Sequence, residues 1–135
     1  RSAAHYLRRY PNRVRSIVVD GVLPPQVPLV ETVSGSVERA KDLLFDDCRN
    51  SPACSARYPD LDGTLDSVLE KSKAGELNFD GINPLTGKKE DVKIDFISAI
   101  NGLHALFYNA EVTTSIPYIL DEALNGNLKP WLVHS

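Results

Sequence analysis

Apolar residues at the start of the chain form two different patterns, one after the other. From Ala3 to Tyr10 they recur at steps of three and four residues, which predicts an amphipathic helix that ends before Pro11. Residues 16–19 (S-I-V-V) then read as a strand that is apolar on both faces, the type buried inside a parallel sheet. No second strand of this kind follows, so we expect the chain to be a piece of a larger protein that supplies the neighbouring strands.

Helical spacing dominates after a proline-rich connector at residues 23–28. An apolar stripe predicts a helix that ends near Cys48, and Ser51-Pro52 is a start signal for the next helix. Similar stripes predict three longer helices, over residues 61–74, 96–107 and 116–124.

Residues 76–94 alternate between apolar and polar positions instead. Leu77 and Phe79 precede the turn-forming sequence N-P-L-T-G at residues 83–87, and Val92 and Ile94 follow it, which predicts a β-hairpin. The predicted fold class is therefore mainly α, with one core-type strand and a β-hairpin. We expect two regions, with the first helix and strand in residues 1–28 and a mostly helical region in residues 29–135.

The composition is that of a globular protein, with 42% hydrophobic and 24% charged residues. No apolar run approaches the ~20 residues of a membrane span. The net charge of −3 is unevenly distributed, because five arginines precede the first acidic residue. Such a start is also typical of nucleic-acid binding, but no recognition helix follows it. We therefore expect a solvated helix face of a larger enzyme, and no nucleic-acid partner, at Arg1, Arg8, Arg9, Arg13 and Arg15.

The two cysteines, Cys48 and Cys54, are predicted at the facing ends of two consecutive helices. A tight turn there can bring their Cα atoms within the ~4.4–6.8 Å that a disulfide needs, and a disulfide indicates an oxidising compartment. Two reduced cysteines are the alternative, with Cys54 at a helix N-terminus that favours its thiolate. Zinc is disfavoured, because no nearby cysteine or histidine completes its coordination.

Motifs for catalysis or cofactor binding are absent from the sequence. The chain has no G-x-S-x-G nucleophile elbow, no glycine-rich phosphate loop and no metal-spaced cluster, so we expect neither a cofactor nor a metal. We interpret His5 as a surface or packing residue and His104 as a hydrogen-bonded packing residue. His134 lies too close to the end of the chain for an interpretation.

A dense motif covers residues 6–25. The chain reads Y-L-R-R-Y-P at residues 6–11, N-R-V-R-S-I-V-V-D-G-V at residues 12–22 and P-P at residues 24–25. This stretch resembles the helix and strand that follow the nucleophile elbow in α/β-hydrolases of serine peptidase family S33, the tripeptidyl and prolyl aminopeptidase-like branch. There it looks like Y-L-R-R-Y-P, then D-R-V-R-S-V-V-L-D-G-V and a Pro-Pro.

Looser motifs extend the resemblance over nearly the whole chain. The sequence D-C-R-N-S-P-A-C at residues 47–54 is similar to the D-C-x-x-x-P-x-C of the family's inserted lid, and Y-P-D-L at residues 58–61 is similar to the Y/F-P-D-L that follows. Residues 83–87 resemble its H-P-x-T-G, and residues 108–126 resemble its Y…LP…A…G region. The resemblance implies the lid region of an α/β-hydrolase fold, together with one helix-strand unit of its core.

This resemblance implies a secreted or periplasmic exopeptidase that releases residues from peptide N-termini through a Ser-His-Asp triad. The triad would lie outside residues 1–135, so we expect this chain alone to be inactive. It would supply the lid that selects the substrate, a peptide or a small ester or amide, above the remainder of the hydrolase domain. Relatives bind the substrate's α-amino group with lid acids, whose candidate counterparts here are Glu111, Asp121 and Glu122.

We expect the substrate cleft on the inner face of the helices between Phe96 and Leu124. Two other functions also fit the residues: an esterase-type α/β-hydrolase lid, and a non-enzymatic helical interaction module. In the interaction module, the strand at residues 16–19 must pair within the chain or in a dimer, because an unpaired apolar strand edge favours aggregation.

Overall fold

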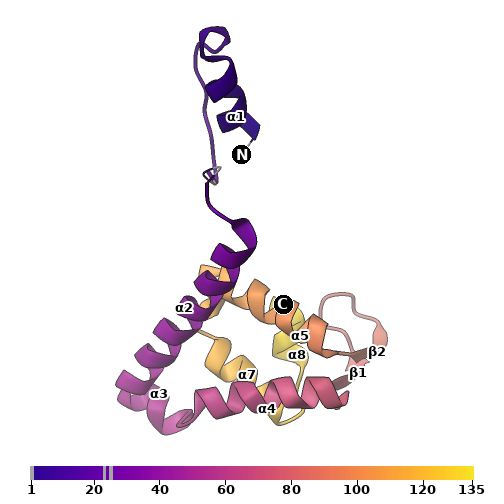
Figure 1. Cartoon of the computed structure of the whole chain (residues 1–135). Helices are drawn as coiled ribbons and strands as arrows, with labels where there is room; N and C mark the ends of the chain where they lie inside the picture. Colours follow the sequence, from indigo (N-terminus) through magenta and orange to yellow (C-terminus); the bar gives the residue numbers. More distant parts are fainter. Residues whose placement is uncertain (1, 23, 25) are drawn as a thin grey trace. The chain divides into compact units, whose positions relative to one another are not determined.

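The computed structural model describes residues 2–22, 24 and 26–135, with the backbone alone at residues 29–34. The chain divides into two compact units, Arg1–Glu38 and Arg39–Ser135. The expected fold class, mainly α with a β-hairpin, is confirmed. Its elements (Figure 1) are, in chain order, α1 (Ser2–Arg9), the 3₁₀ turn η1 (Pro11–Arg13), α2 (Leu29–Asn50), α3 (Pro52–Arg57), α4 (Leu61–Ala74), β1 (Asn78–Ile82), β2 (Lys89–Lys93), α5 (Phe96–Tyr108), α6 (Ala110–Thr113), α7 (Ile116–Leu124) and α8 (Lys129–His134).

The first unit contains α1 as predicted, and Pro11 begins η1 directly after it. Residues 16–19 form no strand, which differs from the prediction, because no described residue pairs with their backbone. Ile17, Val18 and Val19 are instead 40%, 98% and 50% exposed. A strand requires a hydrogen-bonded ladder, so an apolar segment without a neighbouring strand cannot form one.

Helices α3 and α4 begin where the sequence predicts, although the Ser51 side chain makes no capping hydrogen bond to α3. Ser51 precedes α3, with Pro52 as the first helical residue. Asp60 begins α4 by accepting a hydrogen bond from the Gly63 backbone N–H at 2.9 Å. Gly75 ends α4 with a φ of 73°, a left-handed conformation that glycine adopts without a steric penalty.

The hairpin is antiparallel, and Phe79 of β1 lies opposite Val92 of β2. Phe79 is buried, as are Leu77 before the hairpin and Ile94 after it. The Ile94 N–H donates to the Leu77 carbonyl at 2.9 Å, which closes the open end of the hairpin. The alternating pattern predicted for these residues is therefore confirmed, and the apolar side chains on one face of the hairpin pack in the core.

Three polar side chains organise the turn of the hairpin. The Glu90 carboxylate accepts hydrogen bonds from Thr86 Oγ1 at 2.6 Å and from Asn83 Nδ2 at 2.8 Å. The Thr86 bond, followed by the Asn83 bond, lowers the pKa of Glu90 below its usual value. The turn that the sequence N-P-L-T-G predicts is thus held by a carboxylate from β2.

One cross-strand pair opposes the stability of the hairpin. Asp80 lies directly opposite Asp91, and Lys89 Nζ lies 3.5 Å from Asp80 Oδ1, which offsets part of the repulsion between the like charges. We expect Asp91→Lys to raise the free energy of unfolding by about 0.5 kcal/mol, because it replaces a repulsive pair with an attractive one. Urea denaturation measures the change. The neutral Asp91→Thr is the matched control and should give a smaller gain; a loss of stability in Asp91→Lys would contradict the pairing.

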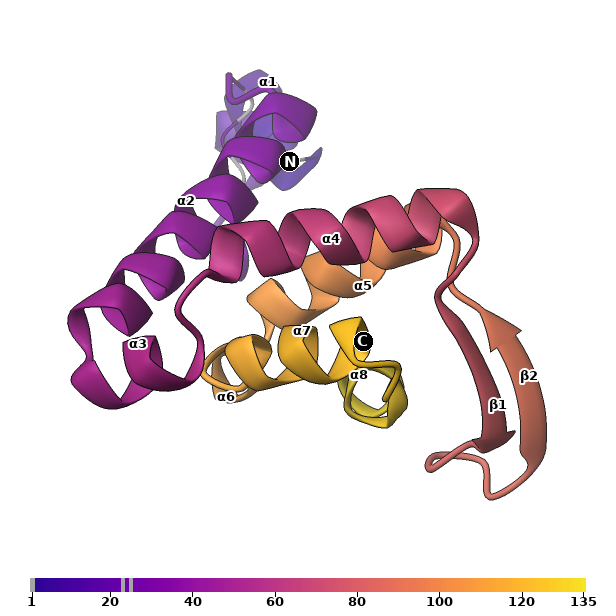
Figure 2. The same ribbon diagram turned by 90° about the horizontal axis from the view of Figure 1, so that it is seen from below.

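The core of the second unit lies between α4, α5, α7 and α8. Helix α4 packs on α5 and α7, and α8 packs on the same two helices (Figure 2). Trp131 of α8 is 2% exposed and lies against Gly102 of α5, where a Cβ atom would stand 2.8 Å from the indole Nε1. Gly102 is therefore explained by the close approach of two helices. Lys71 Nζ joins α4 to α7 by donating to the Leu124 carbonyl at 2.8 Å.

The cap of α5 makes stability depend on pH. Asp95 Oδ1 accepts a hydrogen bond from the Ser98 backbone N–H at 2.8 Å, which holds the pKa of Asp95 below its ordinary value of 3.8. Because the folded pKa is the lower one, the ionised carboxylate stabilises the fold at neutral pH, and this stabilisation is lost as the pH falls through the folded pKa.

We therefore expect a different acid response from the isosteric variant Asp95→Asn, which cannot ionise. In urea titrations between about pH 5 and pH 2, the free energy of unfolding of the wild type should fall more steeply than that of the variant. The other carboxylates are common to both proteins and serve as the internal control. Two parallel curves would show that the Asp95 cap adds no pH dependence.

Candidate functional site

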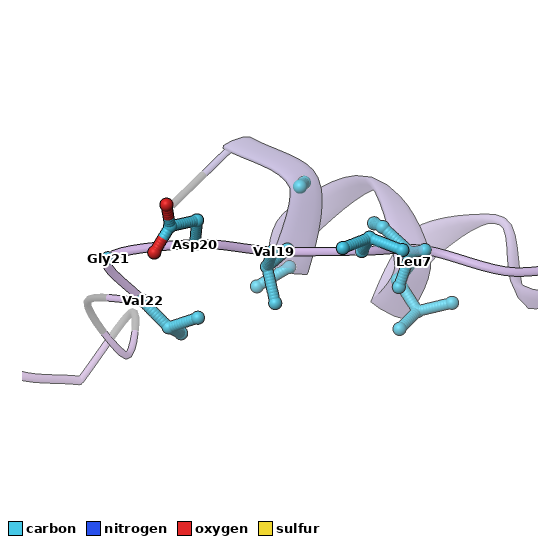
Figure 3. A pocket seen from close by; sticks show the side chains of 9 residues that line it. Leu7, Val19, Asp20, Gly21 and Val22 are labelled. Atoms are coloured by element: carbon cyan, nitrogen blue, oxygen red, sulfur yellow. The ribbon is translucent and has the colours of Figure 1, made fainter.

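The first unit contains an apolar groove between α1 and the segment that follows η1. Ala3, Ala4 and Leu7 line it from α1, and residues 17–22 line it from the other side (Figure 3). Its volume is about 380 Å³. Asp20 supplies the only charged side chain among these lining residues, so the groove presents methyl and methylene groups to solvent.

The backbone along this groove is unpaired. Among the described residues, no hydrogen bond reaches the N–H or C=O groups of residues 15–22. Val14 has extended dihedral angles, with φ of −115° and ψ of 116°, and Gly21 turns the chain with a φ of 60°. The segment between them therefore offers both apolar side chains and unsatisfied backbone groups to a partner.

Exposed cations surround α1 and η1. Within the part of the chain that the structure describes, no carboxylate forms an ion pair with Arg8, Arg9, Arg13 or Arg15. The guanidinium carbons of Arg9 and Arg13 instead lie 5.8 Å and 5.4 Å from the ring centroid of Tyr10. These four cations are exposed to solvent, as the sequence predicts, and Arg1 lies outside the described residues.

The three acids that are candidates for binding an amino group lie on two helices. Glu111 lies exposed on α6, whereas Asp121 and Glu122 are half-buried on α7. Asp121 Oδ2 pairs with Arg57 Nη2 at 3.4 Å, and the Glu122 carboxylate accepts a hydrogen bond from the Asn127 side chain. The role of any of these acids in binding an amino group stays a prediction.

The predicted disulfide is confirmed. Cys48 and Cys54 are bonded across the turn from α2 to α3, with Cα atoms 5.1 Å apart, and neither is reduced. Arg49 strengthens the same turn by pairing with Asp46 at 2.6 Å and with Asp62 of α4 at 2.7 Å. The hydrogen bonds to Asp46 and then Asp62 raise the pKa of Arg49. The turn is therefore a cross-linked corner between three helices.

The surface of α5 is a feature that the sequence analysis missed. Its inner residues, including Leu103 and Leu106, fill the core, so they line no cleft within the second unit. The outer face carries Ile97, which is 66% exposed, and Tyr108, which is 85% exposed. The sequence does contain a signal for this exposed face. A helix with one buried stripe needs apolar residues at only about half of its positions, yet no residue of α5 is charged.

The three histidines form no catalytic pair in the described structure. His5, His104 and His134 are all exposed. His104 differs from the prediction of a hydrogen-bonded packing residue, since it stacks on Tyr108 with ring centroids 6.1 Å apart. One helical turn separates these two residues, and this spacing places both on the outer face of α5.

The described residues contain no group of three or more His, Cys, Asp or Glu side chains placed to hold a metal ion. None of the described helices has the length and apolar character needed to cross a bilayer. The groove of the first unit and the outer face of α5 are two exposed apolar surfaces among the described residues.

Comparisons with models of protein families, with curated proteins and with solved structures found no match to this chain.

Proposed function

We propose that this chain is the lid region of an S33-like α/β-hydrolase, together with the helix and strand that precede the lid. The observation that carries the proposal is the unpaired apolar segment at residues 16–19. Its side chains are exposed beside α1, and its backbone lacks partners among the described residues. A helix beside a strand that is apolar on both faces is the unit from which a parallel α/β sheet is built.

The second unit supports the role of a lid. It has its own core around Trp131 and a disulfide at the corner of α2 and α3, so it can keep its shape while it covers a site in another part of the protein. A lid excludes water from the reaction and restricts which substrates enter. The exposed, uncharged outer face of α5 is a surface that can contact an apolar part of the substrate.

The proposed reaction is the release of residues from peptide N-termini by a serine nucleophile that other residues of the protein supply. The lid would contribute a carboxylate for the substrate's α-amino group. Of the three candidates, Glu111 is best placed, because its carboxylate has no partner among the described residues, whereas Asp121 and Glu122 are already engaged. An oxidising compartment outside the cytoplasm is part of the same proposal, because disulfides persist mainly there.

The test compares residues 1–135 with the complete protein translated from the same reading frame. The complete protein should hydrolyse aminoacyl or tripeptidyl p-nitroanilides and react with a fluorophosphonate probe of serine nucleophiles, whereas residues 1–135 should do neither. Turnover by the purified 135-residue chain would contradict the proposal, as would a complete protein that resists the probe. Hydrolysis of p-nitrophenyl esters without hydrolysis of the anilides would favour the esterase lid instead.

A substitution in the complete protein tests the lid acid. We expect Glu111→Gln to raise the KM for a substrate with a free α-amino group by roughly tenfold, because a charge-assisted hydrogen bond is lost. The KM for the N-acetylated form of the same substrate should not change. Asp66→Gln, an exposed carboxylate change on α4, is the matched control. Equal effects on both substrates would contradict a role for Glu111 in amine binding.

One observation favours the second candidate, a helical interaction module without catalytic activity. The unit Arg39–Ser135 encloses its own core, and no buried side-chain nitrogen or oxygen atom of the described residues lacks a hydrogen-bond partner. Such a unit needs no hydrolase core for its stability. Lack of reaction between the complete protein and the fluorophosphonate probe would favour this candidate.

A further inference from the structure

The unpaired segment carries opposite charges at its two ends. Arg15 stands at its start and Asp20 at its end, and the residues between them are S-I-V-V. Both charged side chains are exposed, and neither has a charged partner among the described residues. A partner strand that pairs with the backbone of this segment and matches its charges should therefore present a carboxylate at one end, a cation at the other and apolar residues between them.

A second copy of this chain meets that description. When two segments run antiparallel with Arg15 opposite Asp20 of the second copy, Ser16 lies opposite Val19 and Ile17 lies opposite Val18. A two-fold axis between residues 17 and 18 relates the copies, so the pair of Arg15 with Asp20 forms twice, once at each end of the ladder. Parallel, in-register pairing would instead place Arg15 beside Arg15 and Asp20 beside Asp20, which is repulsive.

We propose that two copies of this chain associate through an antiparallel ladder at residues 15–20. The backbone is available for it, because no described hydrogen bond involves these residues. The extended Val14 leads into the ladder, and the turn at Gly21 ends it. The ladder covers the nearly fully exposed Val18 and places the groove-lining Ile17 and Val19 against the second copy.

The dimer is a property of the 135-residue chain and does not rest on the proposed function. If a hydrolase core supplies a strand to the same residues in a complete protein, that strand replaces the second copy. The dimer is tested on residues 1–135 alone, and the hydrolase activity is tested on the complete protein. Failure of one proposal is therefore seen separately from failure of the other.

Sedimentation velocity at micromolar chain concentrations tests the dimer. The wild type should show a reversible monomer–dimer equilibrium. Arg15→Asp and Asp20→Arg should each weaken it by at least about tenfold, because both ion pairs become repulsive. An equimolar mixture of the two variants should restore association, since each Asp then faces an Arg. The double variant R15D/D20R should restore it for the same reason.

Arg8→Asp is the matched control, because it makes the same change of charge on α1 outside the ladder, and it should leave the dimer unchanged. All substitutions lie at exposed side chains, and circular dichroism checks that the helices are retained. A wild type that stays monomeric at every concentration would overturn the proposal. So would charge variants that associate as the wild type does, a mixture that fails to recover, or open-ended aggregates in place of a dimer.

Discussion

Trp131→Ala should lower the free energy of unfolding by about 3–5 kcal/mol, the range for removing a large aromatic side chain from a core. Trp131 is 2% exposed and lies where α8 meets α5 and α7, so its loss leaves a cavity between three helices. Urea or thermal denaturation measures the loss. Val133→Ala on the same helix is the control, because Val133 is 40% exposed and should change stability by less than about 0.5 kcal/mol.

The contact between α5 and α8 can be tested from its other side. Gly102→Val adds atoms where even a Cβ would stand 2.8 Å from the Trp131 indole Nε1, so we expect overpacking to cost about 1–3 kcal/mol. Combining Gly102→Val with Trp131→Ala should cost less than the sum of the single changes, because the added valine then occupies part of the cavity. Additive costs would contradict the close approach of these two helices.

Removing the disulfide is expected to have the second largest effect. Cys48→Ala/Cys54→Ala should lower the free energy of unfolding by about 2 kcal/mol, because the bond restricts a short loop in the unfolded chain. Denaturation of the wild type with and without dithiothreitol supplies the control. The reductant should destabilise the wild type by a similar amount and leave the double variant unchanged. A double variant as stable as the wild type would show that the ion pairs of Arg49 hold the corner without the bond.

Local signals in the sequence predict most of the helices and the hairpin. Pro52 begins α3, Gly75 ends α4, and the turn at residues 83–87 separates two alternating strands. These signals act within a few residues, since they depend on dihedral preferences and capping hydrogen bonds. The cysteine pair was predictable for the same reason, because two helix ends six residues apart can meet only at their connecting turn.

Features that depend on distant residues were less predictable. The apolar run at residues 16–19 has the composition of a strand, yet strand formation needs a partner that no described residue supplies. Helix α6 has one buried residue, Val112, so it lacks the apolar stripe by which helices are recognised. Asn109 begins it by accepting a hydrogen bond from the Glu111 N–H at 3.1 Å.

The candidate site was the least predictable part. The family resemblance suggested acids that lie on α6 and α7. The pairing of Asp121 with Arg57 and of Glu122 with Asn127 depends on how helices and turns pack, which residue spacing does not show. The outer face of α5 was missed for a related reason. Apolar residues on all sides of a helix indicate burial, and only the packed structure shows that Ile97 and Tyr108 remain exposed.

Both proposals depend on one property of the molecule: residues 16–19 become a strand only when a second chain or another domain pairs with them. Amide hydrogen exchange at Ile17, Val18 and Val19 measures this property on residues 1–135. In dilute, monomeric protein these amides should exchange as fast as those of an unfolded peptide, while the α4 amides around Val68 stay protected. Protection of residues 17–19 should then appear as the chain concentration rises. Strong protection that persists in the dilute monomer would mean that the segment finds its partner inside this chain, and neither proposal would stand.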